Sequence, residues 1–410
     1  MEKSHNDQEE EISSLAHKYD QALKRIDNYR SKTNAAEVAF LGCQSSASYK
    51  LGHLLIHETK SFKDVLKLFG RIKAIKGRSK YPTNKTIKTS DTPSSNIVDT
   101  LDTTASKIEK PYKNGISIIL PTYKGEKTIV RVLSSLAKQD MPNKLFEIII
   151  VINGEKDDTK NIINEFSQEN TNLNIRIITL DESGASLARN KGLEGASHQY
   201  TLLIDDDDSV SSTYLSSMYS LASNDTIVLA QIINIDEDQV DSSNLINMQI
   251  LKAETPVDNP FLKCPSVLTI NACKLIPTVY MKQVRFNTEL KSGEDIVYFS
   301  ELYSRFSFNY KIAKEAIYFR FIKHDSVSRQ PLSYEFNVIG RLLVISDILN
   351  FMENCSDKYV QNYIKQLVNS QINFINAYIR EYPEQYQTVV DEIKQRELHN
   401  FPYERLHKAV

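Results

Sequence analysis

The sequence predicts an α/β protein in which a mostly parallel β-sheet is sandwiched by helices. From Gly115 onward, short apolar runs alternate with stretches of helical periodicity, as in strand-helix-strand units. One of these runs is followed directly by four consecutive aspartates, Asp205 to Asp208. Because ligands of α/β sheets bind at the carboxyl ends of the strands, we expect the functional site at this edge.

The composition excludes several classes of protein. A length of 410 residues allows two or three domains at ~100–200 residues each. A net charge of −2 gives no global field toward nucleic acid, so no nucleic-acid partner is expected. The longest apolar run, Ile148 to Ile152, is far shorter than the ~20 residues of a membrane span. The polar N-terminus is unlike a secretory signal, so we expect a cytoplasmic protein with reduced cysteines.

Residues 1–80 are predicted to form an N-terminal helical region. Apolar residues from Ile12 to Tyr29 recur every three or four positions, as in a short coiled coil or an ordinary amphipathic helix. A second helix, Ser48 to Lys76, is amphipathic, and lysines and arginines crowd residues 60–80. This segment suits either peripheral contact with an anionic membrane or a solvated charged face. Residues 81–114, rich in Thr, Ser, Lys and Pro, are predicted to be a linker.

The α/β pattern occupies residues 115–330, and residues 331–410 are predicted to form a C-terminal helical bundle. The predicted strands are Ile116 to Leu120, Phe146 to Ile152, Ile175 to Thr179, Tyr200 to Ile204, Thr226 to Ile235 and Ala316 to Phe321. The predicted helices begin at Glu126, after Asp158, at Ala185, at Ser209 and at Gly293. The stretch from Thr226 to Ile235 is followed by polar sequence as far as Asn259, where no element is predicted.

The four aspartates are the strongest single signal in the chain. Adjacent carboxylates repel one another, and core packing gives no reason for them, but hard divalent cations prefer oxygen ligands. The alternative is a solvated acidic loop, which most acidic runs are. A strand that leads directly into the run favours the cation site.

Six short motifs occur in a characteristic order. They are Pro121-Thr122-Tyr123-Lys124-Gly125-Glu126, Asn153-Gly154, Ala188-Arg189-Asn190-Lys191-Gly192, Asp205-Asp206-Asp207, Gly293-Glu294-Asp295 and the segment His324 to Arg329. Each motif is weak alone, but their order resembles that of the inverting family 2 glycosyltransferases. The resemblance covers roughly residues 115–330 and implies the GT-A fold, a Rossmann-like sheet between helices.

The resemblance also implies roles for individual residues. A nucleotide-diphosphate sugar, with a UDP-sugar as the first choice, would be bound by Pro121, Thr122, Tyr123, Glu126, Asn153, Arg189, Asp205, Asp206 and Arg329. Mn²⁺ or Mg²⁺ would be held by Asp207 first, with Asp205 on the ribose or the metal, and by His324. Asp295 would be the catalytic base, and Glu294 would orient the acceptor.

The chemistry of sugar transfer accounts for these residue types. Negative charge grows on the diphosphate as its bond to the sugar breaks, and a divalent metal neutralises it. The acceptor hydroxyl must lose a proton, and inversion needs a single carboxylate base, which Asp295 would supply. One departure from the family pattern is Asn153, which replaces an aspartate that accepts from uracil. An amide oxygen can still accept a hydrogen bond, so uridine remains the expected nucleoside.

Structural roles remain open for several of these residues. Pro121 could simply end a strand, Arg189 could lie on a helix surface, and His324 could belong to an ordinary loop. Glu294 and Asp295 could be acidic residues favoured by a helix N-terminus. A sugar-1-phosphate nucleotidyltransferase would need a Gly-x-Gly-x-Arg loop after the first strand, which this chain lacks. A non-catalytic scaffold that binds a partner glycosyltransferase through its helices would be expected to lose Asp207 or Asp295.

What the family usually does suggests the biological setting. It implies cytoplasmic synthesis of a cell-surface polysaccharide such as capsule, O-antigen or wall polymer, with a glycan or lipid-linked acceptor. The helical flanks, 1–80 and 331–410, then suggest a homo-oligomer or docking at the inner face of the membrane.

Overall fold

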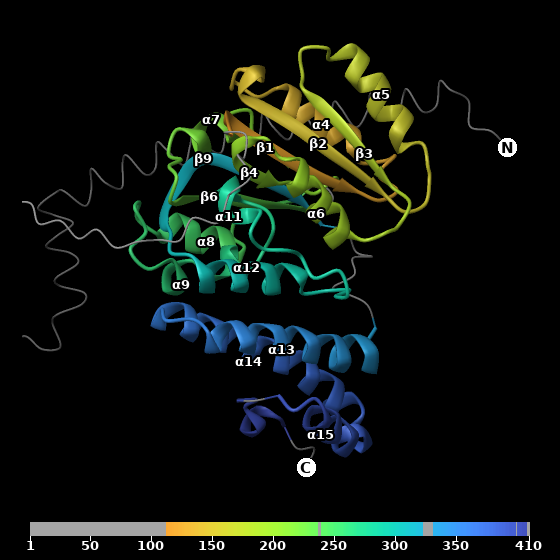
Figure 1. The fold of residues 1–410 in the computed structure, drawn as a ribbon, viewed down its shortest axis with the longest axis vertical. Coiled ribbons are helices and arrows are strands. Elements are labelled where there is room, and N and C mark those ends of the chain that lie inside the picture. The colour runs from red at the N-terminus through yellow and green to blue at the C-terminus, as the bar shows by residue number, and fades with distance from the viewer. Residues whose placement is uncertain (1–111, 237–238, 323–330, 399, 408–410) are drawn as a thin grey trace, which may run out of the picture. The chain divides into compact units, whose positions relative to one another are not determined.

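The computed structural model describes residues 112–236, 239–322, 331–398 and 400–407 (Figure 1). These residues belong to one compact unit that spans 108–410. The predicted N-terminal helices, most of the predicted linker, and the site candidates His324 and Arg329 lie outside the described residues. The membrane contact predicted for residues 60–80 lies outside them too.

A sheet of nine strands forms the centre of this unit. The strands are β1 (Lys113–Thr122), β2 (Phe146–Asn153), β3 (Ile175–Leu180), β4 (His198–Leu203), β5 (Ser209–Val210), β6 (Thr226–Asp236), β7 (Gln239–Asp241), β8 (Lys274–Pro277) and β9 (Asn309–Phe321). Their order is β3-β2-β1-β4-β8-β6-β9-β5, and β7 pairs with β6. Strands β3, β2, β1, β4, β6 and β9 run in one direction, while β8, β5 and β7 run against them. The predicted mostly parallel sheet is confirmed.

Helices cover both faces of the first four strands. In the first half of the unit they are α4 (Ile129–Ala137), α5 (Thr159–Glu169), α6 (Ala185–Gly195) and α7 (Tyr214–Tyr219). In Figure 1, α4 and α5 lie above the strands and α6 lies below them. Because β1 and β2 are thus covered on both sides, they are apolar along nearly their whole length and almost fully buried.

Ser209 does not open a helix, so this prediction is wrong. Ser209 and Val210 form β5, pair with Phe319 and Tyr318 of β9, and are buried. The helix begins only at Tyr214. Pairing with a strand more than 100 residues away overrides the local helical pattern.

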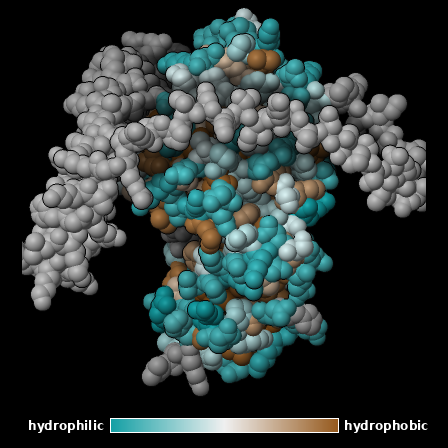
Figure 2. Space-filling view, turned by 90° about the vertical axis from the view of Figure 1, so that its left-hand side faces the viewer, coloured by the Kyte–Doolittle hydropathy of each residue, from teal (hydrophilic) through white to brown (hydrophobic). Residues whose placement is uncertain are grey.

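The chain between β7 and α12 (Glu294–Arg305), for which no helix or strand was predicted, contains several short elements. They are α8 (Leu245–Lys252), α9 (Pro260–Lys263), α10 (Pro265–Leu268), α11 (Thr278–Met281) and strand β8. The side chain of Asn244 caps α8 by accepting a hydrogen bond from the Asn247 N–H at 3.0 Å. Leu245 and Leu251 of α8 are exposed, and Figure 2 shows apolar residues interrupting the hydrophilic surface on the face where α8 lies.

The C-terminal part is helical, as predicted. It contains α13 (Gly340–Glu353), α14 (Lys358–Glu381) and α15 (Tyr386–Gln395). Helix α12 (Glu294–Arg305) lies between these helices and the sheet (Figure 1). Leu342 and Ile345 of α13 belong to the same continuous hydrophobic core as Ile118 of β1. Within the described part of the chain, no helix combines the length and the apolar character that crossing a membrane requires.

A buried polar cluster lies at the amino edge of the sheet, opposite the strand ends predicted to bind ligand. The Glu147 carboxylate accepts hydrogen bonds from the hydroxyls of Ser117 and Ser197, at 2.7 and 2.8 Å, and from the Ser197 N–H. Its Oε1 also lies 3.0 Å from Nδ1 of His198. Burial raises the pKa of Glu147, but the hydrogen bonds from His198, Ser117 and Ser197 outweigh burial and lower this pKa to about 2.

Glu147 is therefore expected to stabilise the fold in a pH-dependent way. Its pKa in the folded state lies below the ordinary value of 4.5, so its contribution is present above that pH and is lost as the pH falls toward 2. The difference corresponds to about 3 kcal/mol. Urea unfolding of Glu147→Gln between pH 7 and 3 should show lower stability at pH 7 and a shallower decline. Glu165→Gln, on the exposed face of α5, should match the wild type; equal declines in all three proteins would contradict this prediction.

Candidate active site

Most of the described residues that were predicted to bind the donor lie at the carboxyl edge of β1, β2 and β4. Thr122 and Asn153 are the last residues of β1 and β2, and Asp205 lies two residues after the end of β4. The pairing of β4 with β1 continues past the end of β4, because the Ile204 N–H donates to the Ile119 carbonyl at 3.1 Å. Pro121 is buried within β1, where it faces Val151 of β2, so it belongs to the sheet that supports this edge.

Thr122 and Asp206 join the first strand to the aspartate loop. The Thr122 hydroxyl donates a hydrogen bond to Oδ2 of Asp206. A Cβ on Gly125 would lie 2.2 Å from Oγ1 of Thr122 and 2.8 Å from Oδ2 of Asp206, so only glycine fits. Lys124 reaches this turn with a φ of 52°. The Lys124-Gly125 pair thus allows the backbone to pass close to the Thr122–Asp206 hydrogen bond.

Asn153 connects β1 to the loop that precedes α6. Its Nδ2 donates to the Thr122 carbonyl at 2.8 Å, and its Oδ1 accepts from the Gly184 N–H at 2.9 Å. The side chain is buried. This position needs one donor and one acceptor, and a carboxylate would place a second acceptor against the Thr122 carbonyl. The geometry therefore explains the amide, and contact of Asn153 with a nucleobase stays a prediction.

Tyr123 presents an aromatic ring at this edge. Its side chain is 47% exposed, and its ring lies against Gly154. An exposed ring held by a neighbouring backbone can stack on a flat ligand such as a nucleobase. Glu126 is exposed in the turn before α4.

Arg189 joins the aspartate loop to the start of α12. Its Nη2 lies 3.3 Å from Oδ1 of Asp205, and its Nη1 lies 2.9 Å from Oε1 of Glu294. The Arg189 side chain is 8% exposed, so the alternative of a surface residue is excluded. Burial lowers the pKa of Arg189, but Asp205 and Glu294 outweigh burial, and the net pKa is raised. Arg189 is therefore a permanent cation between two segments that are distant in the sequence.

Glu294 and Asp295 form the first turn of α12. Gly293 precedes them with a φ of 86°, a left-handed conformation that favours glycine. Oδ1 of Asp295 accepts from the Ile296 N–H at 2.8 Å. Burial and the neighbouring Glu294 raise the pKa of Asp295 to about 7, against the opposing effects of Arg189 and Lys274. A carboxyl group with this pKa is suited to accept a proton near neutral pH.

Tyr318 and Asp208 support the aspartate loop, and sequence analysis did not identify Tyr318. The Tyr318 hydroxyl accepts from the Asp205 N–H at 3.2 Å and donates to Oδ2 of Asp208 at 2.6 Å. Oδ1 of Asp208 accepts from the Phe321 N–H at 2.8 Å. Asp208 is buried, and burial together with Asp205 raises its pKa well above the ordinary value. The fourth aspartate thus binds β9. No local pattern marks a tyrosine in a distant strand as its partner.

The donor set at the strand ends suits Mg²⁺ or Mn²⁺ that is shared with a substrate. In the described part of the chain, no three His, Cys, Asp or Glu residues are grouped to hold a metal by themselves. Asp205 and Asp207 supply two carboxylates, and Mg²⁺ commonly binds through one or two carboxylates plus substrate phosphates. Burial raises the pKa of Asp205, Arg189 opposes this, and Asp207 adds to it. Excess negative charge at the loop is the condition that a cation would relieve.

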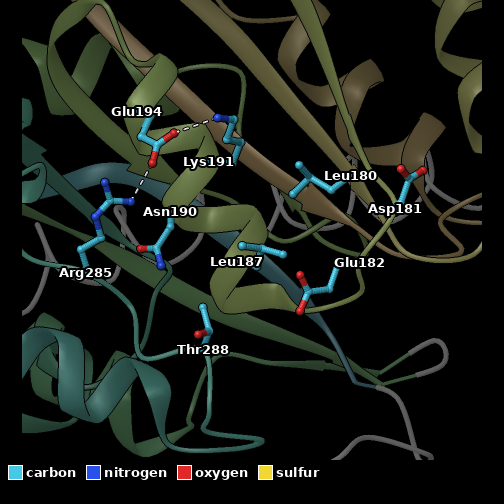
Figure 3. A pocket seen from close by; sticks show the side chains of 9 residues that line it. All are labelled: Leu180, Asp181, Glu182, Leu187, Asn190, Lys191, Glu194, Arg285 and Thr288. Carbon is cyan, nitrogen blue, oxygen red and sulfur yellow. Dashed lines mark hydrogen bonds and ion pairs between the residues drawn. The ribbon is translucent and has the colours of Figure 1, made fainter.

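A cavity of about 610 Å³ adjoins this edge (Figure 3). Figure 3 shows side chains from the end of β3, from α6 and from the segment around Arg285 that line it. Leu180 of β3 pairs with Asn153, which places the cavity beside the predicted donor site. Glu194 binds both Lys191, at 3.0 Å, and Arg285, at 2.7 Å, so the cations of this wall are already paired.

Comparison with known proteins finds relatives that are named as sugar transferases. Residues 117–284 match the family model described as Glycosyl transferase family 2. The chain is 25% identical over 264 residues to the poly(ribitol-phosphate) beta-N-acetylglucosaminyltransferase TarS of Staphylococcus aureus (strain Mu50), covering 63% of this chain and 44% of TarS. It is 27% identical over 214 residues to a poly(ribitol-phosphate) beta-glucosyltransferase of Bacillus spizizenii, covering 51% and 32% respectively. The chain thus spans less than half the length of these relatives.

Solved structures of S. aureus TarS share the fold. The crystal structure of TarS 1–349 in complex with UDP-GlcNAc matches with a TM-score of 0.53 at 21% identity, covering 68% of this chain and 83% of that one. The complex of the same fragment with UDP matches with a TM-score of 0.51 at 22% identity, covering 66% and 78%. The α/β fold class predicted from the sequence, with helices toward the C-terminus, is confirmed.

Proposed function

Because this chain belongs to glycosyltransferase family 2 through residues 117–284, we propose that it is a metal-dependent inverting glycosyltransferase that uses a UDP-sugar. One observation carries the proposal furthest: buried Arg189 joins Asp205, on the predicted donor side, to Glu294, beside the predicted base. A single cation thereby couples the nucleotide-binding loop to the segment that would activate the acceptor. The UDP-GlcNAc bound to the TarS fragment supports UDP as the nucleotide.

The donor would bind along the ends of β1, β2 and β4. The Tyr123 ring offers a stacking surface for the nucleobase, and the Thr122–Asp206 bond holds the loop below it. Asp207 and Asp205 would hold Mg²⁺ or Mn²⁺ against the diphosphate. When bound, this metal supplies positive charge that offsets the charge developing on the leaving diphosphate.

Transfer would proceed by a single displacement. The oxygen of the acceptor hydroxyl forms a bond to the anomeric carbon while its proton moves to the Asp295 carboxylate. The bond between that carbon and the diphosphate oxygen breaks, and its electron pair leaves with the diphosphate. Attack from the face opposite the leaving group inverts the anomeric configuration. Glu294 is held in place by Arg189 and would orient the acceptor.

The acceptor is proposed to be a cell-surface glycan or its lipid-linked precursor. The two relatives named above act on poly(ribitol phosphate), which makes a polymer of that kind the first acceptor to test. A cytoplasmic location, membrane contact through residues 60–80 and oligomerisation through the helical flanks belong to the same proposal. Deletion of residues 1–80 followed by measurement of membrane partition and oligomer mass tests the last two.

The proposed donor site can be tested by thermal shift with UDP, GDP and CDP, each with and without Mn²⁺. We expect UDP to raise Tm only in the presence of metal, because the metal would hold the diphosphate against Asp207 and Asp205. A ligand at 100 times its Kd stabilises the protein by about 2.7 kcal/mol. Asp207→Ala should abolish this shift. The control Asp391→Ala alters an exposed carboxylate of α15 and should retain it. If no nucleotide shifts Tm under either condition, the proposed function is wrong.

A further inference from the structure

Arg341 of α13 is a buried cation with neutral hydrogen-bond partners. Its Nη1 donates to Oε1 of Gln371, and its Nη2 donates to Oγ of Ser292, both at 3.2 Å. The guanidinium lies 4.6 Å from the ring centres of both Phe336 and Phe374, and the residue is 5% exposed. Its Nε is buried without a hydrogen-bond partner. A buried charge in such surroundings is unfavourable unless opposite charge lies nearby.

The opposite charge is at the start of α12. Ser292 immediately precedes Gly293, and a Cβ on Gly293 would lie 3.7 Å from Nη1 of Arg341 and 2.8 Å from Cγ2 of Val344. Arg341 therefore packs against the backbone that presents Glu294 and Asp295. Burial lowers the pKa of Arg341, and the charge that opposes this most is Asp295, followed by Glu294.

We propose that Arg341 is a positioning residue for Asp295, through which the C-terminal helices fix the start of α12. The hydrogen bond to Ser292 and the contact with Gly293 set the direction of the first turn. The positive charge of Arg341 interacts with both carboxyl groups of the acidic pair. This inference rests on the proposed function in treating Asp295 as the base, and it makes α13 and α14 part of the active site.

Several other groups also act on Asp295. The charged and titratable groups from the surrounding elements are Arg189 of α6, Glu294 of α12, Lys274 of β8, Tyr363 of α14 and Arg341 of α13. Nζ of Lys274 donates to the carbonyls of Val267 and Ile270 and lies 3.9 Å from the ring centre of Phe299, one helical turn after Asp295. Two further cations, Arg189 and Lys274, thus remain when Arg341 is removed. Removing Arg341 should therefore raise the pKa of Asp295 only moderately, by about one unit.

The first test is a thermal double-mutant cycle that needs no substrate. Tm is measured from pH 5.5 to 8.5 for wild type, Arg341→Met, Asp295→Asn and the double variant. We expect Arg341→Met to lower Tm more at pH 8.5 than at pH 5.5, because ionised Asp295 then lacks a facing cation. In the Asp295→Asn background, the Tm loss caused by Arg341→Met should be the same at both pH values. Arg396→Met removes a half-buried arginine that binds Glu392 in α15, and its effect should be constant over this range.

The second test uses sugar transfer from the UDP-sugar. Arg341→Met should lower kcat by roughly tenfold to a hundredfold through misplacement of the base, with the donor KM nearly unchanged. The pH at which its rate is half-maximal on the acidic side of the pH–rate profile should rise by about one pH unit. Arg341→Lys keeps the charge, so it should restore the profile and part of kcat. Ser292→Ala removes a single hydroxyl and should still fold; it should lower kcat without moving the profile.

These outcomes separate the inference from the proposed function. A loss of Tm that is equal at every pH, together with unchanged kcat and pH profile, would overturn the positioning role. If Arg341→Met does not fold, Arg341→Lys and Ser292→Ala decide the question, and wild-type kcat in both would overturn it. If the wild type transfers no sugar, the proposed function fails, while the thermal cycle still decides whether Arg341 and Asp295 are coupled.

Discussion

Replacing Asp295 with asparagine is expected to lower kcat by roughly 10²- to 10⁴-fold, the usual contribution of a general base. An amide cannot take the proton of the acceptor hydroxyl, although it fills the same space. UDP release measured with saturating donor and acceptor gives kcat, and Tm shifts with UDP and Mn²⁺ report whether the donor still binds. Binding should persist, because Asp295 is not one of the residues proposed to hold the donor or the metal. Asp391→Asn, on the exposed surface of α15, should retain full activity.

The pH dependence follows from the same carboxyl group. The pKa of Asp295 is about 7, so the ionised base becomes abundant only as the pH rises through that value, and kcat should rise with it. Stability should change in the opposite sense. A carboxyl whose pKa is raised on folding stabilises the fold at low pH, and this contribution is lost as the pH rises toward 7. Asp295→Asn should therefore have a higher Tm than wild type at pH 8. A flat pH–rate profile between 6 and 8 would contradict the assignment of the base.

Arg189→Met is expected to impair both folding and donor binding. It leaves the carboxylates of Asp205 and Glu294 without the cation that joins them, and breaking a buried ion pair costs about 3–5 kcal/mol. The Asp205 side chain keeps 41% of its surface exposed, so we expect a loss below this range, about 2–3 kcal/mol. Urea unfolding at pH 8 measures this loss. The Tm shift with UDP and Mn²⁺ should also shrink, because Asp205 is no longer held in place.

A matched control is available on the opposite side of α6. Arg285 binds Glu194 at 2.7 Å, a comparable distance, but its side chain is 65% exposed. Arg285→Met should change stability by less than about 0.5 kcal/mol. Arg189→Lys should fall between wild type and Arg189→Met, because an ammonium group cannot reach both carboxylates as the fork does. Equal losses in Arg189→Met and Arg285→Met would contradict the central role of the buried bridge.

The sequence by itself determined the elements whose signal is local. Helix α6 has the predicted bounds, Ala185–Gly195, and β2 extends the predicted strand by one residue. These elements are recognisable because apolar periodicity and turn residues act within a few positions of one another. The order of the six motifs likewise indicated the family, since motif order is a property of the chain alone. The resemblance is confirmed for residues 117–284, which match the model of that family.

The tertiary structure decided which charges meet. Arg189 and Glu294 are 105 residues apart, and Asp208 and Tyr318 are 110 apart, so no local pattern could pair them. Strand β5 was missed for the same reason, because its partner strand follows about 100 residues later. The pKa of Asp295 depends on burial beneath elements from several parts of the chain. Hydrogen-bond partners, desolvation and charge compensation are set by distances in space, whereas periodicity and motifs are set by distances along the chain.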